Sequence, residues 1–470
     1  MEFIKLFKIK RSTLLLISSM SLLPSLASAE TINLGIGTQD TTTNTVTAGI
    51  VLKKLGLLDK YLPHTGKYQG VSYNISWLNA TSAPPITNSM MAGKLQIGMM
   101  GDYPLLVNGA IGQQLNNQTE LIAVIAYNRY GSGNGIVVPK NSPYYDISDL
   151  KGKIVSVPFG SAAHGMLMNA LSERGLPPDY FNLISQSPEV GITSLQENHI
   201  DAHADFVPYP ELLAFRGIGR KIYDGAETDI PTFHGIVVRK DFADKYPEVV
   251  IGYLKAVLAA DNWFKSNPVQ ASEKIEQWTK INKEVVYIYL GPDGIHTLDS
   301  TIKPLLVNAL KKDYGLLRKI NMVKPLNINA WVNDSYIKQA YKELGYNYAA
   351  QLGSFSNYGI NTEDPECHVT IKNQEAIGQI WFSDGNLISY SSPECTFSVL
   401  RRTPGKEIDT VYVIDHQRGI KMFALNAFYN VVTSNGHLRI TPFMLKKDAE
   451  LYNHKNGGEL ESYQQVIAKK

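Results

Sequence analysis

Two hydroxyl side chains mark the most informative part of the chain, residues 71–104. Thr81 and Ser82 stand where the N-cap of a helix belongs. Pro84 and Pro85 follow at positions where a first helical turn tolerates proline. Backbone N–H groups without partners and the positive end of the helix dipole meet at such a point. The segment therefore predicts a site for a small anion, in which Ser82 either touches the ligand or only caps its helix.

A second loop, at residues 160–165, offers the same chemistry. Ser161 follows a predicted strand there and opens a predicted helix, so the loop could hold an anion or serve the helix alone. Asp102 follows the strand predicted at residues 96–100 and is an unexpected neighbour for an anion. We expect it either to cap a turn at residues 101–104 or to meet a cationic group, such as the amine of an aminosulfonate.

Histidines and methionines raise the question of a metal. Histidines that converge from separate strand ends can hold a transition metal, but we expect these three to bind backbone or face solvent: His164, His203 and His234. Four methionines suggest copper in the same way: Met90, Met91, Met99 and Met100. Two of these four lie on a predicted buried strand, so core packing is the better interpretation.

The elements that must position these residues alternate between strands and helices. Strands are predicted at residues 31–39, 71–78, 96–100, 119–127 and 234–242, and helices include 46–60 and 86–94. This pattern predicts an α/β fold of two lobes joined by two crossings. Lobe 1 comprises residues 30–127 and 237–352, and lobe 2 comprises residues 128–236. Small ligands bind at the carboxyl edge of the strands in sheets of this kind.

The first 29 residues have the pattern of a secretory signal. Basic residues precede an apolar run at residues 14–26, which ends in Ala27-Ser28-Ala29. We predict cleavage after Ala29 and a soluble, exported protein in the periplasm, because the run is short for a membrane anchor. A net charge near +2 and the lack of basic runs argue against nucleic acid as a partner.

The composition changes around residues 353–360, which we predict to be a linker. The region that follows, residues 361–470, is rich in predicted strands, and we expect a separate small α+β domain there. Both cysteines of the chain, Cys367 and Cys395, lie in this region. The first three quarters of an exported chain must therefore fold without a disulfide, which requires a large core.

Residues 30–352 resemble the nitrate/sulfonate/taurine class of periplasmic substrate-binding proteins of ABC transporters. The resemblance rests on NLGIGTQ, TSAPPITNSMMAGKLQIGMMGDYP, DLKGKIVSVPFGSAAHGML and DAHADFVPYPELL followed by FHGIVVRKDF, in this order. It implies a hinged two-lobed clamshell that closes on a small anionic or zwitterionic solute and delivers it to a permease in the inner membrane. From this resemblance and the loop positions, the candidate ligand-binding residues are Gln39, Asp40, Ser82, Ala83, Asp102, Tyr103, Tyr127, Gly160, Ser161, Ala162, His164, Asp205, Phe206, Tyr209 and His234.

Residues 361–466 resemble the NosL family, copper-binding accessory proteins of nitrous oxide reductase maturation. The resemblance rests on the early cysteine, IWFSDGNLISYSSPECTFSVL and TPFMLKKDAELYNHKNGGELESYQQV. Where the family has a Cys-Gly-Met metal motif, this chain has Cys367-His368-Val369. The resemblance implies a Cu(I) site with the candidate ligands Cys367, His368, His437 and Met444. A disulfide between Cys367 and Cys395 is the competing prediction, and free thiols are a third.

The leading interpretation is a monomeric solute-binding protein that performs no chemistry and requires no cofactor. No nucleophile with a matching base and no phosphate-binding loop stands in a convincing context. Two alternatives stay open. The cleft or the appended domain could handle or sense a metal such as copper. The fold also resembles thiamine-pyrimidine synthases, but their cysteine-rich motif is missing, because no cysteine precedes Cys367.

Overall fold

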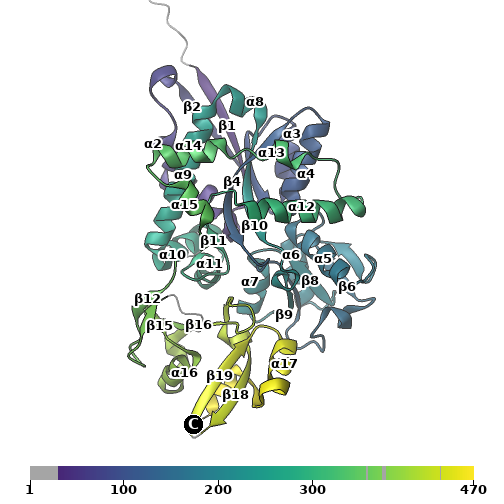
Figure 1. The fold of residues 1–470 in the computed structure, drawn as a ribbon, viewed down its shortest axis with the longest axis vertical. Helices are drawn as coiled ribbons and strands as arrows, with labels where there is room; N and C mark the ends of the chain where they lie inside the picture. The colour runs from purple at the N-terminus through teal and green to yellow at the C-terminus, as the bar shows by residue number, and fades with distance from the viewer. Residues whose placement is uncertain (1–29, 356–357, 373–376, 435, 470) are drawn as a thin grey trace, which may run out of the picture.

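The computed structural model describes residues 30–355, 358–372, 377–434 and 436–469 (Figure 1). The predicted signal sequence and its cleavage after Ala29 lie outside these ranges. Among the helices that the structure describes, none is both long enough and apolar enough to cross a membrane.

The first lobe is built on a six-stranded sheet with the order β11-β4-β10-β3-β1-β2. Strand β1 pairs in parallel with β2 and β3, whereas β10 runs antiparallel to β3 and β4. The three central strands β3, β4 and β10 are buried almost throughout, as expected for a sheet covered on both faces. The strand bounds are β1 Thr31–Thr38, β2 Ser72–Asn79, β3 Ile97–Gly101, β4 Thr119–Asn128, β10 Thr232–Arg239 and β11 Thr297–Leu298.

Helices from two separate parts of the chain cover this sheet (Figure 1). The part before the second lobe contributes η1 Thr43–Ala48, α1 Ile50–Leu55, α2 Leu57–Tyr61, η2 Gly66–Tyr68, α3 Ala83–Met91 and α4 Asp102–Gln114. The part after it contributes α8 Lys240–Lys245, α9 Pro247–Ser266, α10 Pro268–Thr279, α11 Lys283–Leu290, α12 Pro304–Lys319, α13 Ile328–Trp331, α14 Ser335–Glu343 and α15 Tyr348–Gly353.

The second lobe has a five-stranded sheet of its own, with the order β7-β6-β8-β5-β9. Its strands are β5 Gly135–Pro139, β6 Ile154–Val157, β7 Asn182–Ser185, β8 Ala202–Asp205 and β9 Gly219–Asp224. Its helices are η3 Ile147–Leu150, α5 Ala162–Glu173, α6 Pro188–Gln196, α7 Tyr209–Phe215 and η4 Gly225–Thr228. Two α/β lobes therefore stand in the order that the alternating sequence pattern predicts.

Two crossing segments join the lobes, one after β4 and one between β9 and β10. They pass so close that a Cβ on Gly131 would lie 2.4 Å from the carbonyl oxygen of Ile230, and Gly131 has φ +103°. Only glycine fits such a position. Because β10 begins at Thr232 in the first sheet, residues 232–236 belong to the first lobe, not to the second as the sequence suggested. The register of β10, and not the hydrophobic pattern, fixes this boundary.

Residues 361–469, which we call the C-terminal segment, form three small sheets with the orders β12-β13, β15-β14-β16-β17 and β19-β18-β20. Their strands are β12 Asn361–Glu363, β13 Thr370–Lys372, β14 Gly378–Phe382, β15 Leu387–Tyr390, β16 Ile408–Ile414, β17 Lys421–Phe423, β18 Phe428–Ser434, β19 His437–Phe443 and β20 Glu459–Ser462. The helices are α16 Pro393–Arg402, η5 Gly405–Glu407, η6 Ala424–Asn426, α17 Lys446–Asn456 and α18 Tyr463–Ala468. The segment lies at the opposite end of the molecule from β2 and α8 (Figure 1).

Candidate ligand-binding site

A small cavity lies between the two lobes, at the carboxyl edges of β1, β3 and β6. The first lobe lines it with Gln39, Ser82, Ala83, Pro84, Gly101, Pro104 and His234. The second lobe lines it with Phe159, Ser161, Ala162 and Phe206. Among these described residues there is no arginine, lysine, aspartate or glutamate, so a ligand would meet neutral donors and apolar walls.

Two helices begin at this cavity, α3 from the first lobe and α5 from the second. The Ser161 hydroxyl accepts a hydrogen bond from the backbone N–H of His164 at 3.2 Å, and so it caps α5. Ser82 holds the same position before α3, but its side chain makes no capping bond in the structure. The Ser82 hydroxyl is therefore available to a ligand. Both helix N-termini bring partial positive charge to the cavity without a formal charge.

His234 adds a third donor. Strand β10 runs antiparallel to β3 and pairs His234 with Gly101, so the start of β10 lies at the edge where β3 ends. The Asn44 side-chain amide donates to His234 Nδ1 at 3.2 Å, which leaves the proton of the neutral ring on Nε2. Burial lowers the pKa of His234 to about 3, so the ring is neutral at physiological pH. Nε2–H is thus a donor with no other partner among the described residues.

The apolar wall comes mainly from the second lobe. Phe159 is half-exposed and stacks on His164, with ring centroids 4.8 Å apart and planes within 12° of parallel. His164 Nδ1 accepts from the backbone N–H of Gly160 at 3.2 Å, which holds this ring in place. Burial lowers the pKa of His164 to about 4. His164 therefore supports Phe159 from behind and does not line the cavity itself, as the sequence had suggested.

Two polar contacts join the lobes outside the cavity lining. The Thr41 hydroxyl of the first lobe lies 3.1 Å from the Tyr209 hydroxyl of the second. The Asn169 amide of α5 donates to Asp313 Oδ1 of α12 at 2.8 Å. These two contacts between lobes describe a closed clamshell, and Tyr209 contributes to closure instead of to the cavity wall.

The structure differs from two expectations about Asp102, the turn at residues 101–104 and the contact with a cationic group of the ligand. The sequence predicted a turn at residues 101–104, but Asp102 opens α4. Its Oδ1 accepts from the Tyr103 backbone and its Oδ2 accepts from the Thr232 hydroxyl at 2.6 Å. It faces a second small cavity, which is also lined by Asp313 and by residues of the two crossing segments. Burial raises the pKa of Asp102, and no part of this carboxyl lines the first cavity, so it is not placed to meet an amine there.

Asp205 belongs to a buried relay. The Ser156 hydroxyl lies 2.7 Å from His203 Nδ1, and His203 Nε2 lies 2.8 Å from Asp205 Oδ2. All three side chains are fully buried on β6 and β8. The arrangement has the residue types of a nucleophilic triad, but a substrate cannot reach a serine with no exposed surface. The relay is therefore structural.

The candidate residues fall into two groups. Those that line the cavity are Gln39, Ser82, Ala83, Ser161, Ala162, Phe206 and His234. Those that do not line it are Asp40, Asp102, Tyr103, Tyr127, Gly160, His164, Asp205 and Tyr209. Four further residues line the cavity, and each adjoins a candidate residue in the sequence: Pro84, Gly101, Pro104 and Phe159. The pattern of helix starts and strand ends that indicated the neighbouring candidates also indicates these residues.

Among the described residues of the two lobes, the histidines do not form a set of metal ligands. His164, His203 and His234 are held by Gly160, by the buried relay and by Asn44, and do not surround one point. Met90, Met99 and Met100 are fully buried in the core, in keeping with the packing interpretation. Within the described ranges, the group of potential metal ligands that does lie close together is Asp364, Cys367 and Cys395.

Cys367 and Cys395 form a disulfide, with their Cα atoms 6.0 Å apart. The structure thus contains the disulfide, which was the alternative to a copper site at Cys367. His437 begins β19 and Met444 follows its end, so seven residue steps of extended chain, roughly 20 Å, separate them. Together with Cys367 and His368, these two residues cannot hold one ion in this structure. Copper binding and the NosL likeness of the C-terminal segment stay predictions.

Relatives of this chain include proteins named for the binding of taurine and of aliphatic sulfonates. The chain is 32% identical over 197 residues to the taurine-binding periplasmic protein of Escherichia coli (strain K12), a match that covers 41% of this chain and 58% of that protein. The chain thus aligns with less than two thirds of that relative's length.

Two solved structures share the fold. The alkanesulfonate-binding protein of Xanthomonas axonopodis pv. citri, bound to MOPS, superposes with a TM-score of 0.54 at 19% identity and covers 65% of this chain and 99% of its own. The periplasmic aliphatic sulphonate binding protein of Escherichia coli gives 0.52 at 22%, covering 64% and 92%. These similarities establish the two-lobed α/β fold. The model of the NMT1-like family matches residues 27–278, more than half of the chain, and the protein therefore belongs to the NMT1-like family.

Proposed function

We propose that this protein is the exported solute-binding component of an importer and that it captures a small aliphatic sulfonate between its lobes. One observation carries the proposal. The cavity combines two helix N-termini, two serine hydroxyls and the Nε2–H of His234 with phenylalanine and proline walls. A sulfonate is a compact anion with three acceptor oxygens, and an alkyl tail is apolar. Head and tail each find a matching part of the cavity.

Neutral donors are sufficient for this head group. A sulfonate keeps its single negative charge throughout the physiological pH range, and each helix N-terminus supplies about half a positive charge. Two such ends oppose the charge of the ligand without a buried arginine or lysine, which would need desolvation of its own. Ser82 and His234 then supply directed hydrogen bonds, of the kind that is strongest when the acceptor is charged.

The tail is expected to be free of charge. Phe159, Phe206, Pro84 and Pro104 offer apolar contact, and no carboxylate lines the cavity among the described residues. A primary ammonium group placed there would lose its hydration without an ion-pair partner. This argument favours alkanesulfonates over aminosulfonates.

Taurine is the second candidate, and the 32% identity to a taurine-binding protein favours it. Gln39 lines the cavity, and its amide oxygen is the side-chain acceptor that an ammonium group could use there. A single neutral acceptor compensates an ammonium less well than a carboxylate does. We therefore expect taurine to bind more weakly than ethanesulfonate.

Binding without chemistry fits the side chains that line the cavity. Ser161 is engaged at the start of α5, and Ser82 has no general base beside it among the described residues. His234 Nδ1 is occupied by Asn44. Activation of a serine requires a base within hydrogen-bond reach, which neither hydroxyl has. We propose that the ligand is released unchanged to a membrane permease when the lobes separate.

A ligand panel tests this proposal. The melting temperature of the mature protein should rise with ethanesulfonate, less with taurine and least with nitrate, because a ligand that binds only the native state adds stability by mass action. At a hundredfold excess over Kd the gain is about 2.7 kcal/mol. The Ser82→Ala variant should show a smaller rise than wild type. Ser266→Ala, a change at an exposed position of α9, should show the same rise as wild type. The absence of any shift with all sulfonates would overturn the proposal.

A further inference from the structure

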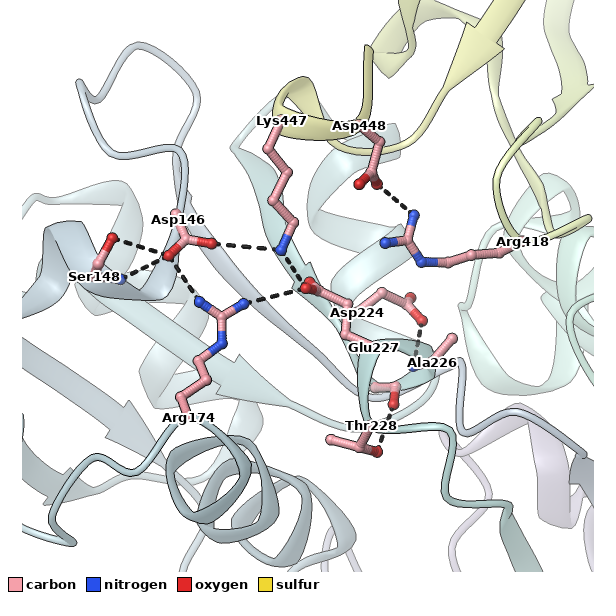
Figure 2. Close-up of polar contacts among 11 residues, drawn as sticks. Asp146, Ser148, Arg174, Asp224, Ala226, Glu227, Thr228, Arg418, Lys447 and Asp448 are labelled. Atoms are coloured by element: carbon pink, nitrogen blue, oxygen red, sulfur yellow. Dashed lines mark hydrogen bonds and ion pairs between the residues drawn. The ribbon is translucent and has the colours of Figure 1, made fainter. Parts of the chain in front are cut away.

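The C-terminal segment holds a charged contact with the second lobe and with one crossing between the lobes (Figure 2). Lys447, in the first turn of α17, lies 3.4 Å from Asp146 and forms an ion pair with Glu227. Asp146 precedes η3 in the second lobe. Glu227 is on η4, in the segment that leads from β9 back to the first lobe. A residue of the C-terminal segment therefore reaches the hinge itself.

Both acidic residues also bind Arg174 at the end of α5. Arg174 Nη1 lies 2.8 Å from Asp146 Oδ1, and its Nη2 lies 3.2 Å from Glu227 Oε2. The four side chains are between 12% and 32% exposed, so their charges are partly shielded from water. Burial raises the pKa of Glu227, and the charge of Lys447 opposes this effect. Without Lys447, Arg174 would be the one described cation in ion pairs with both carboxylates, and the network would lose a positive charge.

The C-terminal segment also packs on the first lobe, through α11. The Tyr412 hydroxyl donates to the carbonyl of Glu284 at 3.0 Å, and the Gln379 amide donates to the Tyr287 hydroxyl at 3.1 Å. The Tyr287 ring lies 5.4 Å from Trp381 and 5.6 Å from Tyr412, measured between centroids. All of these side chains are buried. This contact is a continuous apolar core, which separates less readily than an ion-pair network near the surface.

The C-terminal segment thus touches both lobes on the side of the crossings. If the lobes rotate apart, the segment cannot follow both, so one of its contacts must break. On the second lobe the ion pairs of Lys447 are joined by two ring contacts, Phe215 with Phe423 and Tyr145 with Phe428, at 5.2 and 6.5 Å between centroids. Of these rings only that of Phe423 is buried, and the others are half-buried. The contact with α11 is fully buried, so the contact with the second lobe is the weaker of the two. We propose that the C-terminal segment is a brace that favours the closed clamshell, and that the contact of Lys447 with Glu227 and Asp146 is released on opening.

The brace has a consequence for the ligand, which rests on the proposed function. A sulfonate between the lobes and the brace beneath them both favour the closed state. Two interactions that favour the same state strengthen each other, and the effect is reciprocal. Loss of the brace should therefore weaken the binding of a ligand that Lys447 never touches.

The test uses full-length mature protein with Lys447→Met, Glu227→Gln and the double change. Without ligand, small-angle scattering should show a larger radius of gyration in each variant than in wild type. Titration with ethanesulfonate should give affinities weaker by about fivefold or more, the lower range of typical coupling between sites. The double variant should lose less binding free energy than the two single variants lose in sum, since both single changes break the same contact.

A matched control is available in the first lobe. Lys338 forms an ion pair with Asp334 at 2.8 Å and lies over the ring of Tyr348, both in the first lobe. Lys338→Met should leave scattering and affinity unchanged. If wild type binds no sulfonate, the proposed function fails, but scattering without ligand still decides the brace. Identical scattering in wild type and all three variants, each folded by circular dichroism, would overturn it.

Discussion

The side-chain amide of Asn44 lies 3.2 Å from Nδ1 of His234, although 190 residues separate them in the chain. This contact determines which nitrogen of the imidazole carries the proton, and therefore whether the ring donates to the cavity or accepts from it. An uncharged donor at this point suits an anion that is held by helix N-termini. Asn44 is a positioning residue for the site, and it has no place in any of the motifs.

The first prediction concerns His234. Replacement of His234 by Phe should weaken ethanesulfonate binding about tenfold or more, because a hydrogen bond to a charged group contributes about 1.5–3 kcal/mol. Calorimetric titration measures the loss. His234→Gln, which retains an amide donor, should recover part of it. His199→Phe, at an exposed position in the second lobe, is the control and should bind as wild type does.

The protonation of His234 gives a related expectation. Burial lowers its pKa to about 3, so the charge of the ring does not change between pH 5 and pH 8. Affinity should accordingly be flat across this range. A rise in affinity below pH 6.5 would contradict the account, since it would mean that a charged imidazolium binds the anion.

The second prediction concerns the acidic cavity at the crossings. Burial raises the pKa of Asp313, and the nearby Asp102 carboxyl raises it further. The native state then keeps a proton that the unfolded chain loses above pH 4, so stability falls as pH rises from there. Asp313→Asn lacks this titrating group. The free energy of unfolding of the variant, relative to that of wild type, should therefore be higher at pH 8 than at pH 5 by about 1–2 kcal/mol. Denaturant unfolding at both pH values measures it.

The control for Asp313 is Asp179→Asn, a change at an exposed position of the second lobe. Its effect should be the same at both pH values. The assignment would be wrong if Asp313→Asn also had one constant effect, because that result would mean that Asp313 is ionised in the native state over the whole range.

The third prediction concerns the disulfide. Cys367 and Cys395 are 28 residues apart, and closing a loop of this length stabilises a fold by about 3–4 kcal/mol in the chain-entropy account. Cys367→Ser with Cys395→Ser should lower the stability of the C-terminal segment by up to this amount, measured by calorimetry. Unchanged thermal unfolding would show that the bond contributes nothing.

Copper uptake is a separate test of the same pair. The oxidised protein should bind no Cu(I) through Cys367, because the sulfur is bonded to Cys395. A competition titration of the reduced protein, wild type against Cys367→Ser, decides the copper prediction. Equal affinity in the two reduced proteins would remove the copper role of Cys367.

Sequence predicted the elements near the site closely where local chemistry dominates. The strand expected at residues 71–78 is β2, one residue later, and the helix predicted after Ser82 is α3, which begins with Ala83 and two prolines. The hydrophobic pattern did not predict where a helix is interrupted by the backbone conformation of a glycine. The helix expected at residues 46–60 is divided twice, at Gly49 between η1 and α1 and at Gly56, which takes φ +62° between α1 and α2. The turn expected at 101–104 is instead the first turn of α4, where Pro104 is tolerated.

The rest of the site could not be predicted because it depends on contacts between distant residues. The orientation of Asp102 follows from Thr232, which is 130 residues away. Closure of the lobes brings Thr41 to Tyr209, and the fold of the second lobe brings Arg174 to Asp146. No local pattern encodes these pairs. Sequence alone identified loops that line the cavity, but not which side chains in them turn toward it.

Calorimetric titration of the mature protein with ethanesulfonate, after exhaustive dialysis to remove bound solute, tests the central claim most directly. The account predicts saturable binding of one molecule per chain, tighter than the binding of taurine measured in the same way. It also predicts that Ser82→Ala and His234→Phe each weaken this binding while the protein stays folded. Absence of saturable binding by every sulfonate tested, in protein that unfolds cooperatively, would contradict the account.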